Sequence, residues 1–534
     1  MKKIVTLIVV LFSLIGCGGS EVEITVLANA GAEDWMVAAG EAVNNADVRT
    51  TDGSRVRVTV QTLEAGDAAV QLADGSIQPA MWIPDDQVWA NVAAQQGNGN
   101  FQSNCASVAE SPLVIGMWRD VAGLLGWPGR SLGWLDVGSL AADTSSWEYY
   151  SGGQYGDALR LGHTHPGLSA SGASTLLALV HSAESTTQAI TPADIAQPIV
   201  QASVGAFEGG VSWFSKDTET LGSTMYERGS SFLGAGVMYE NTVLAEGRGE
   251  IVPIYPYEGT FMATHPACVN SAASAEEQAA AVAFRDWLLG SEGQQLAVTY
   301  GLRPVNDVAD LSIFEQFTGV DLNQPALTFA APSVEAIFAA QELWQTARKP
   351  IHLALVLDTS GSMRGSKING MLEAATQFVS QMGDSDYLTI INFYHQPDIE
   401  AQRVRVGDSR AELVSLIARM EAGGDTSLYD AIGVAGEILA TTNSAETANA
   451  MVVLTDGQDT SSNRYSFNQA LFDTAQANST TVFTIAYGRD ADDSVLEQIA
   501  QEANGQFFLG TEANIVDIYD EMSAAFGGSA GIGR

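Results

Sequence analysis

The feature that most constrains the fold is an apolar run that ends in a carboxylate and two hydroxyls. Residues 351–357 are apolar apart from one histidine, as in a short strand that is buried on both faces. Asp358, Ser360 and Ser362 follow, and apolar side chains then recur at helical spacing over 368–382. The pattern predicts a strand, a tight turn and a helix. In a parallel α/β sheet such a turn lies at the carboxyl edge, where ligands bind, and its oxygen atoms suit Mg²⁺ or Mn²⁺ better than zinc.

Two later stretches of the sequence fit the same site. Residues 423–427 form a Gly-rich loop that contains Thr426 and opens a predicted helix at 428–439. The apolar strand 450–454 ends in a threonine followed by Asp456. Because the carboxyl ends of parallel strands meet at one edge of a sheet, we expect these side chains to lie near the first turn.

Together the three motifs resemble the von Willebrand factor A (VWA) domain and its metal-ion-dependent adhesion site (MIDAS), over about residues 350–526. The resemblance implies a doubly wound, Rossmann-like α/β domain, which we assign to 348–526, with bound Mg²⁺ or Mn²⁺. In the resembled family an acidic side chain of a protein partner completes the coordination of the metal. The alternative is a structural A domain without metal. By the resemblance, the metal ligands are Asp358, Ser360, Ser362, Thr426 and Asp456.

The first residues of the chain have the pattern of an export signal. Two lysines follow Met1, and residues 4–15 are apolar but too few to span a membrane. The sequence Leu14-Ile15-Gly16-Cys17 resembles a bacterial lipobox, which implies a signal peptide over 1–17, cleavage before Cys17 and lipidation of its thiol. The alternative is an ordinary secretory signal. We expect a protein of the bacterial cell envelope that faces the periplasm or the exterior and contacts the membrane through its lipid alone.

The cysteine count indicates one disulfide. The chain has three cysteines, and lipidation of Cys17 leaves Cys105 and Cys268 as an even pair in an oxidising compartment. We expect a disulfide between these two, and the alternative is two small buried thiols.

The strong acidity of the chain excludes some partners. Its 63 acidic and 24 basic residues give a formal net charge of −39, spread along the whole length. Such a charge argues against binding nucleic acid and against docking on anionic lipid. A solubilising surface suited to salty water is the simpler explanation.

The part before the VWA-like region, 22–347, begins with repeated strand–loop–helix units, with strands expected at 22–27, 56–62 and 80–83. Such repeats predict a parallel sheet. Residues 284–305 look like the late helix pair of the periplasmic solute-binding proteins of ABC importers, and shorter pieces at 82–85, 162–172 and 254–260 fit that family as well. The resemblance implies two α/β lobes with the ligand between them. We place lobe one at 22–110 and 262–347, and lobe two at 111–261.

The resemblance also implies which side chains lie in the cleft between the lobes. For each of them the alternative is a capping or packing role. The oxyanion-binding relatives usually carry serines in the first two loops, where this chain has Asn29-Ala30-Gly31 and Gly66-Asp67, and this departure puts an oxyanion ligand in doubt. The candidates are Asn29, Gly66, Asp67, Trp82, Ser111, Ser171, Tyr239 and Tyr255.

The sequence is compatible with three functions. The first is a surface protein that captures an unknown protein partner through the MIDAS, with the solute-binding module as receptor or scaffold for a small molecule. The second is the substrate-binding component of an ABC importer, with a permease as partner and the VWA domain as an accessory. The third, a hydrolase, is the weakest, because no nucleophile–base pair is visible and the G-x-S-x-G sequence lies in the expected flexible tail, 527–534. We therefore expect no enzyme.

Overall fold

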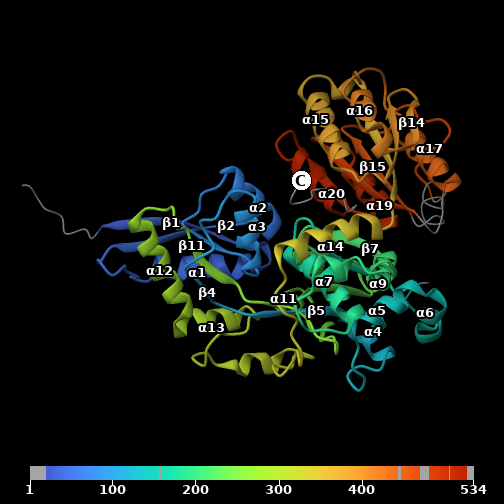
Figure 1. Ribbon diagram of the computed structural model, residues 1–534. Coiled ribbons are helices and arrows are strands. Elements are labelled where there is room, and N and C mark those ends of the chain that lie inside the picture. Colours follow the sequence, from blue (N-terminus) through green and yellow to red (C-terminus); the bar gives the residue numbers. More distant parts are fainter. Residues whose placement is uncertain (1–19, 156–157, 443–446, 469–479, 504, 526–534) are drawn as a thin grey trace, which may run out of the picture.

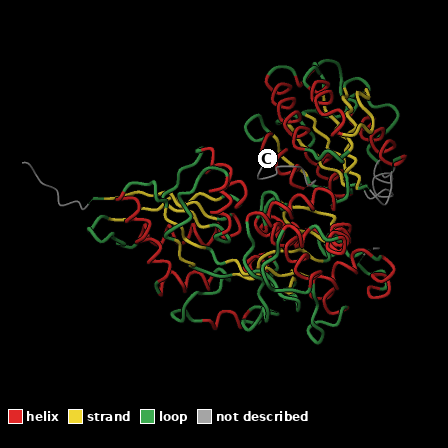
Figure 2. Tube along the Cα trace, viewed as in Figure 1, coloured by secondary structure: helices red, strands yellow, loops and turns green. Residues whose placement is uncertain are grey.

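The chain folds into three α/β units, each built on its own sheet (Figures 1 and 2). The computed structural model describes residues 20–525, except 156–157, 443–446, 469–479 and 504. The expected signal peptide, the expected lipobox with Cys17 and the expected tail at 527–534 lie outside the described residues.

The first sheet forms lobe one and has the strand order β2-β1-β3-β11-β4. Strands β1, β2 and β3 are parallel, whereas β11 runs antiparallel to β3 and β4. Leu27 of β1 packs on the side of α2 and α3, whereas its neighbours Val26 and Ala28 pack on the side of α1, α12 and α13. The strands are β1 (Glu21–Ala28), β2 (Arg55–Thr62), β3 (Met81–Ile83), β4 (Cys105–Ser107) and β11 (Pro266–Val269). The helices are α1 (Glu33–Asn45), α2 (Ala65–Asp74), α3 (Val88–Gln95), α12 (Ala275–Leu289) and α13 (Ser291–Thr299), with a short 3-10 helix at Ala30–Ala32.

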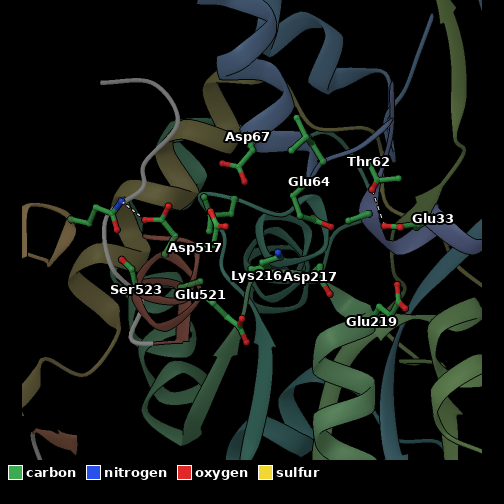
Figure 3. A pocket seen from close by; sticks show the side chains of 16 residues that line it. Glu33, Thr62, Glu64, Asp67, Lys216, Asp217, Glu219, Asp517, Glu521 and Ser523 are labelled. Atoms are coloured by element: carbon green, nitrogen blue, oxygen red, sulfur yellow. Dashed lines mark hydrogen bonds between the residues drawn. The ribbon is translucent and has the colours of Figure 1, made fainter. Parts of the chain in front are cut away.

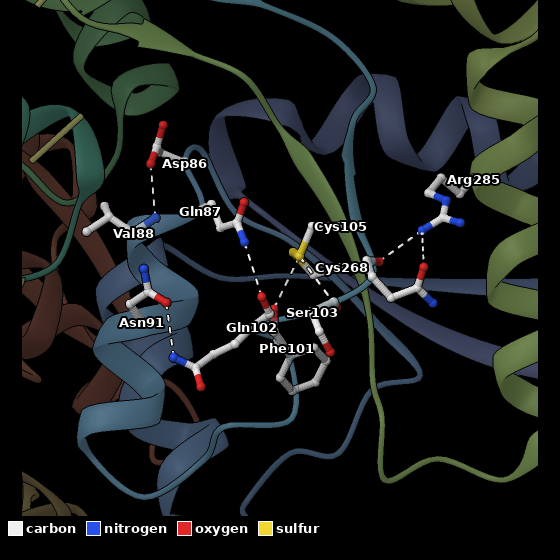
Figure 4. Close-up of a disulfide and its surroundings, with 11 residues drawn as sticks. Asp86, Gln87, Val88, Asn91, Phe101, Gln102, Ser103, Cys105, Cys268 and Arg285 are labelled. Carbon is white, nitrogen blue, oxygen red and sulfur yellow. Dashed lines mark hydrogen bonds between the residues drawn. A yellow bond between two sulfur atoms is a disulfide. The ribbon is translucent and has the colours of Figure 1, made fainter. Parts of the chain in front are cut away.

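A disulfide joins the two antiparallel strands at the edge of the first sheet (Figure 4). Cys105 of β4 and Cys268 of β11 face each other in the register of the strand pair, with their Cα atoms 4.0 Å apart. Although 163 residues separate them in the sequence, the crossover through lobe two brings them side by side.

The second sheet forms lobe two and has the order β10-β5-β8-β6-β7, with β9 also paired to β5. Its strands are β5 (Ser111–Trp118), β6 (Leu161–Thr164), β7 (Val211–Ser215), β8 (Ala235–Tyr239), β9 (Ile251–Ile254) and β10 (Met262–Ala263). Its helices are α4 (Arg119–Leu124), α5 (Trp134–Ala142), α6 (Thr144–Ser151), α7 (Ala170–Glu184), α8 (Pro192–Ile195), α9 (Pro198–Gly210), α10 (Thr218–Arg228) and α11 (Glu240–Glu246).

The segment 262–347, which we expected in lobe one, divides between the lobes. β10 pairs with β5 in the second sheet, and α14 (Val334–Ala347) packs against α7 and α9 of lobe two. The 3-10 helix Leu311–Gln316 lies between α13 and α14 along the chain. The physical reason is the apolar face of α14, because Trp344 packs edge-to-face on His165 and Phe214 of lobe two. The Trp344 Nε1–H also donates to Glu208 Oε2 at 2.9 Å.

The third sheet forms the C-terminal domain and has the order β14-β13-β12-β15-β16-β17, in which only β14 runs antiparallel to its neighbour. Leu353, Leu355 and Leu357 of β12 pack on the face of α15, α16 and α20, whereas Ala354 and Val356 pack on the face of α17. The sheet is therefore doubly wound, as expected. The strands are β12 (Ile351–Asp358), β13 (Tyr387–Phe393), β14 (Pro397–Arg405), β15 (Ala448–Thr455), β16 (Thr481–Tyr487) and β17 (Phe507–Gly510). The helices are α15 (Ser366–Gln381), α16 (Val406–Ile417), α17 (Leu428–Thr441), α19 (Asp493–Glu502) and α20 (Ile515–Ala525), with a 3-10 helix at Gly361–Met363.

The C-terminal domain packs directly on lobe two (Figure 1). Trp213 of β7 stacks on Phe483 of β16, with ring centroids 5.7 Å apart and an interplanar angle of 17°. β7 also packs against α20, and one cluster of buried apolar side chains continues from lobe two into the C-terminal domain. Buried aromatic contacts of this kind hold the two units as one packed body.

Candidate functional site

The five predicted metal ligands come together at the carboxyl edge of the third sheet. Asp358 is the last residue of β12, and Asp456 directly follows β15, which is the parallel neighbour of β12. Ser360 and Ser362 lie in the turn after β12, and Thr426 lies in the loop before α17. We call these five residues the oxygen site.

Hydrogen bonds fix the geometry of the oxygen site. The Ser360 N–H donates to Asp358 Oδ1 at 2.7 Å, and the Thr455 hydroxyl donates to Asp358 Oδ2 at 2.5 Å. The Ser360 and Ser362 hydroxyl oxygens are 2.9 Å apart, and the Ser362 hydroxyl donates to Asp456 Oδ1 at 2.6 Å. One chain of polar contacts therefore links both aspartates through the two serines.

The Thr426 hydroxyl approaches the same point from the opposite loop. A Cβ atom built on Gly457 would lie 3.7 Å from Thr426 Oγ1 and 3.8 Å from Ser362 Oγ, so the two hydroxyls converge over this glycine. The backbone N–H groups of Thr460 and Ser461 donate to the Thr426 carbonyl at 2.8 and 3.0 Å, which holds the loop in place.

The electrostatics of the oxygen site favour a cation. Asp358 and Asp456 are both completely buried. Burial, and to a smaller degree the charge of Asp456, raises the pKa of Asp358 above its ordinary value. The donor set of two carboxylates and three hydroxyls is all oxygen and fits a hard divalent cation. Nowhere in the part of the chain that the structure describes do three His, Cys, Asp or Glu side chains converge as a metal centre would need, so a metal here depends on the hydroxyl ligands.

One residue at this site was not predicted from the sequence. The Lys367 ammonium lies 2.6 Å from Asp456 Oδ2, on the side of this carboxylate that Ser362 leaves free. Lys367 is the second residue of α15, and its side chain is 27% exposed. The sequence did contain an indication of this contact. Lys367 lies in the first helical turn after the motif, from where a side chain can extend to the carboxyl edge of the sheet.

Several of the expected cleft residues form hydrogen bonds to other residues of the two lobes. The Gly66 N–H donates to the Leu168 carbonyl at 2.8 Å, across the lobe boundary. The Ser111 hydroxyl donates to Asn241 Oδ1 at 2.8 Å, and the Asn241 amide donates to the Gly31 carbonyl at 3.1 Å. The Gly66–Leu168 and Asn241–Gly31 bonds join lobe one directly to lobe two.

Asn29 and Ser171 are likewise satisfied by neighbouring side chains. The Asn29 amide donates to Asp85 Oδ2 at 2.6 Å, and the Ser171 hydroxyl lies 2.6 Å from Thr164 Oγ1. All four of these side chains are buried. The structure thus places both candidates in packed polar contacts.

Trp82 and Tyr255 lie elsewhere than expected. Trp82 is completely buried in lobe one and packs edge-to-face on Phe101, with centroids 5.8 Å apart, so it does not stand at a cleft mouth. Tyr255 donates to Glu240, which also holds the Arg303 guanidinium in a buried ion pair at 2.6 Å. Trp82 is thus held by packing and Tyr255 by polar contacts, both within the module.

Two cavities of about 410 Å³ each flank the contacts between the lobes, and Asp67 and Tyr239 of the expected set line them. The first, which we call the acidic cavity, lies where lobe one, lobe two and α20 of the C-terminal domain meet (Figure 3). The second, which we call the aromatic cavity, is lined by Trp89, Phe261, Phe329 and Tyr239, together with Asp85.

Most charged side chains that line the acidic cavity are carboxylates, and they come from lobe one, lobe two and α20 of the C-terminal domain. Every charged lining side chain that the structure describes, except Lys216, is a carboxylate. Lobe one contributes Glu33, Glu64 and Asp67, lobe two contributes Asp217 and Glu219, and α20 contributes Asp517, Asp520 and Glu521.

Burial makes ionisation of these carboxylates unfavourable. It raises the pKa of Asp67 to about 6 and that of Glu219 to about 7, where neighbouring carboxylates add to the effect. Burial, followed by the charges of Asp85 and Asp217, raises the pKa of Glu64 well above its ordinary value. Burial also raises the pKa of Asp85 to about 7. A cation bound between the lobes would therefore favour the ionised forms of these carboxylates, whereas an oxyanion would be repelled by them.

Comparison with known proteins identifies both modules. The family model described as bacterial extracellular solute-binding protein matches residues 24–303, more than half of the chain. The model described as von Willebrand factor type A domain matches residues 352–521. Both are binding modules.

Individual relatives share only parts of the chain. An uncharacterized protein of Synechocystis sp. is 29% identical over 201 residues, which cover 37% of this chain and 45% of that protein. Inter-alpha-trypsin inhibitor heavy chain H4 of Sus scrofa is 31% identical over 178 residues, covering 32% of this chain and 19% of that protein. The chain thus spans less than half the length of either curated relative. Among solved structures, the sulfate-binding protein SubI of Mycobacterium tuberculosis H37Rv shares 18% identity over 56% of this chain and 92% of its own, with a TM-score of 0.41.

The matched families also bear on where the protein acts. Membership among extracellular solute-binding proteins indicates the cell envelope, outside the cytoplasm. Among the helices within the described ranges, none combines the length and the apolar character needed to cross a membrane. The chain belongs to the bacterial extracellular solute-binding protein family and carries a von Willebrand factor type A domain after its solute-binding module.

Proposed function

We propose that this protein is an envelope receptor whose VWA domain binds Mg²⁺ or Mn²⁺ at the oxygen site and thereby captures a protein partner. The observation that carries the proposal is the convergence of five oxygen-bearing side chains at the carboxyl edge of the VWA sheet. A divalent cation held there would offer an open coordination position to a carboxylate of the partner.

The direction in which the oxygen site faces supports capture of a large partner. Lobe two packs against the other end of the sheet, near Ile351 and Phe483, so the solute-binding module leaves the carboxyl edge free. A strand of eight residues such as β12 separates the two ends by roughly 25 Å. Around the oxygen site, Ser362, Gly424 and Asp425 are exposed. A partner therefore reaches the site without displacing any of the residues that the structure describes.

The residues of the site have separate tasks in this proposal. Asp358 and Asp456 supply the negative charge, and Ser360, Ser362 and Thr426 supply neutral oxygen ligands. The hydrogen bond from Thr455 and the N–H of Ser360 hold Asp358 in one orientation. Preorganised ligands of this kind lose little conformational freedom when a metal binds.

Metal titration by calorimetry tests the proposal. Wild-type protein should bind Mg²⁺ and Mn²⁺ once per chain, and Asp358→Ala should not, although it stays folded because the ligands lie above the core. Asp490→Ala removes an exposed carboxylate in the loop after β16 and is the matched control, which should bind as the wild type does. Equal binding by Asp358→Ala and wild type, or none by wild type, would exclude the metal site.

Partner capture requires its own experiment. Immobilised protein should retain an envelope protein in Mg²⁺ and release it in a chelator, and Asp358→Ala should retain none. Retention that is unchanged by the chelator would show that the partner binds elsewhere.

A second candidate function is the substrate-binding component of an ABC importer, with the VWA domain as accessory. The match of more than half of the chain to solute-binding proteins favours it. A permease gene next to this one, and loss of solute uptake on deletion of this gene, would support the importer. In either case we propose that lipid on Cys17 anchors the protein, and Cys17→Ser should release it from the membrane fraction.

A further inference from the structure

We propose that the acidic cavity binds a flexible organic cation with two or more ammonium groups, and that this ligand ties α20 of the VWA domain to both lobes. The inference deepens the proposed receptor role by naming the class of its solute, and it rests on that role. It is independent of metal at the oxygen site, which lies at the carboxyl edge of the VWA sheet.

The first observation is an unpartnered buried carboxylate oxygen. Glu64 is 5% exposed and lines the acidic cavity, yet its Oε2 atom has no hydrogen-bond partner. Figure 3 shows its side chain directed into the cavity, among the other lining carboxylates. An unpaired buried carboxylate oxygen is unfavourable, so a donor supplied by a ligand would be strongly stabilised there.

The second observation is the uneven charge of the cavity. Lys216 attracts Asp67 and Glu521, and this attraction opposes the effect of burial on both carboxylates. Among the residues that the structure describes, no such cation acts on Glu64, which lies near the negative Asp85 and Asp217 and has a side-chain hydrogen bond with Ser169. None acts on Glu219 either, whose charged neighbours are all carboxylates. The Glu64–Asp217–Glu219 side therefore lacks a counter-charge from the described lining residues, and a ligand ammonium would supply it.

The size and lining of the cavity select the class of cation. A volume of about 410 Å³ matches a small organic molecule, and the lining carboxylates do not converge in the manner of a metal centre. No aromatic ring is among the lining residues that the structure describes, so the stacking surface that holds quaternary ammonium groups is missing. Primary and secondary ammonium groups, which donate hydrogen bonds to carboxylates, fit this lining.

The position of the carboxylates couples the ligand to the arrangement of the modules. Glu64 belongs to lobe one, Glu219 to lobe two, and Asp517 to the exposed side of α20. A single rigid ion cannot reach carboxylates spread over three elements, whereas a chain with several ammonium groups can. A solute bound in the cavity would thus be in direct contact with the domain that carries the oxygen site.

Calorimetry with spermidine and putrescine at fixed ionic strength tests the proposal on the purified soluble protein. Spermidine should bind once per chain. Glu64→Gln keeps the shape of the side chain and should weaken binding about tenfold, since it removes one charged hydrogen bond. Asp517→Asn should weaken it as well, because α20 contributes to the site. Glu276→Gln makes the same chemical change as Glu64→Gln on the exposed surface of α12 and should leave affinity unchanged.

Several results would overturn the proposal. They are no heat with either amine, equal affinity of Glu64→Gln and wild type, or displacement of spermidine by Mg²⁺ or tetramethylammonium at equal concentration. Full affinity in Asp517→Asn would overturn the link to the VWA domain. If Glu64→Gln fails to fold, Glu219→Gln takes its place in the comparison. Asp358→Ala should bind spermidine normally, so loss of metal binding and loss of amine binding are separate outcomes.

Discussion

The Arg348 guanidinium and the Asp386 carboxylate form a buried, two-pronged ion pair at the joint between the two modules. The two N–H···O distances are both 2.9 Å, and the side chains are 1% and 3% exposed. Asp386 also accepts the N–H groups of Gly383 at 2.8 Å and Ile351 at 3.0 Å. Since Arg348 directly follows α14 and Ile351 begins β12, this carboxylate holds the connecting residues between the modules in place.

Removal of Arg348 should destabilise the VWA domain strongly. In Arg348→Met the Asp386 carboxylate stays buried without its cation, which costs about 3–5 kcal/mol. Denaturant unfolding followed by tryptophan emission measures the loss. The control is Arg405→Met, because Arg405 forms an exposed pair with Asp408 at 3.6 Å, and such pairs contribute at most about 1 kcal/mol. Similar losses in the two variants would show that the buried pair does not stabilise the joint.

The disulfide should matter for lobe one and not for the VWA domain. Cys105 and Cys268 clamp the edge strand β4 to β11, and opening this bridge should cost roughly 2–5 kcal/mol. Cys105→Ala/Cys268→Ala should lower the midpoint of the transition that reports lobe one and leave Mg²⁺ affinity unchanged. Mass measurement under denaturing, non-reducing conditions checks the bond itself, and two free thiols there would contradict it.

Two of the three motifs of the oxygen site could be predicted from the sequence because they follow strongly apolar strands, β12 and β15. Strands that are buried on both faces can be recognised in the sequence as continuous apolar runs, and neighbouring parallel strands end at the same edge of the sheet. Asp358 and Asp456 therefore needed no tertiary information, whereas Thr426, in the loop between α16 and α17, was assigned through the resemblance to the VWA domain. Lys367 was not predicted as part of the site, because a single lysine in a helix is ordinarily solvated. Only the structure shows that its ammonium group contacts Asp456.

The space between the lobes could not be predicted in the same way. Trp82 is the middle residue of a strand of three residues, and Phe101, from a loop nearly twenty residues later, packs edge-to-face on it. The apolar face of α14 is visible in the sequence, although nothing in the pattern tells which lobe it meets. The acidic cavity joins Glu64 and Asp517, which are hundreds of residues apart and have no periodic relation. Such sites form where separate units of the fold pack together, and local sequence patterns do not predict these contacts.

Lys367 should compete with metal at the oxygen site. Its ammonium lies 2.6 Å from Asp456 Oδ2 and neutralises part of the charge that a cation needs. Lys367→Met should therefore bind Mg²⁺ roughly tenfold more tightly, which corresponds to about 1.4 kcal/mol. Calorimetry of this variant beside Arg364→Met, which removes an exposed cation near the same loops, isolates the effect. Weaker binding by Lys367→Met would instead show that the lysine positions Asp456.

Asp85 should make the stability of the solute-binding module fall as the pH rises. Burial raises the pKa of Asp85 to about 7, so between roughly pH 4 and pH 7 the folded chain keeps a proton that the unfolded chain releases. The cost of ionising this buried carboxylate is absent below this window and fully present above it. Asp85→Asn keeps an acceptor for the Asn29 amide and removes the titrating group.

The melting temperature of Asp85→Asn, relative to wild type, should therefore be higher at pH 8 than at pH 5, by at least about 2 °C. Asp143→Asn is the control, because the pKa of Asp143 is shifted in the opposite direction from that of Asp85. Hydrogen bonds from Ser146 and Ser145 lower the pKa of Asp143 to about 2, so its contribution is already complete at pH 5. The difference between that control and wild type should be the same at both pH values. A difference for Asp85→Asn that also stays constant would show that this carboxyl group does not titrate between pH 5 and pH 8 in the folded protein.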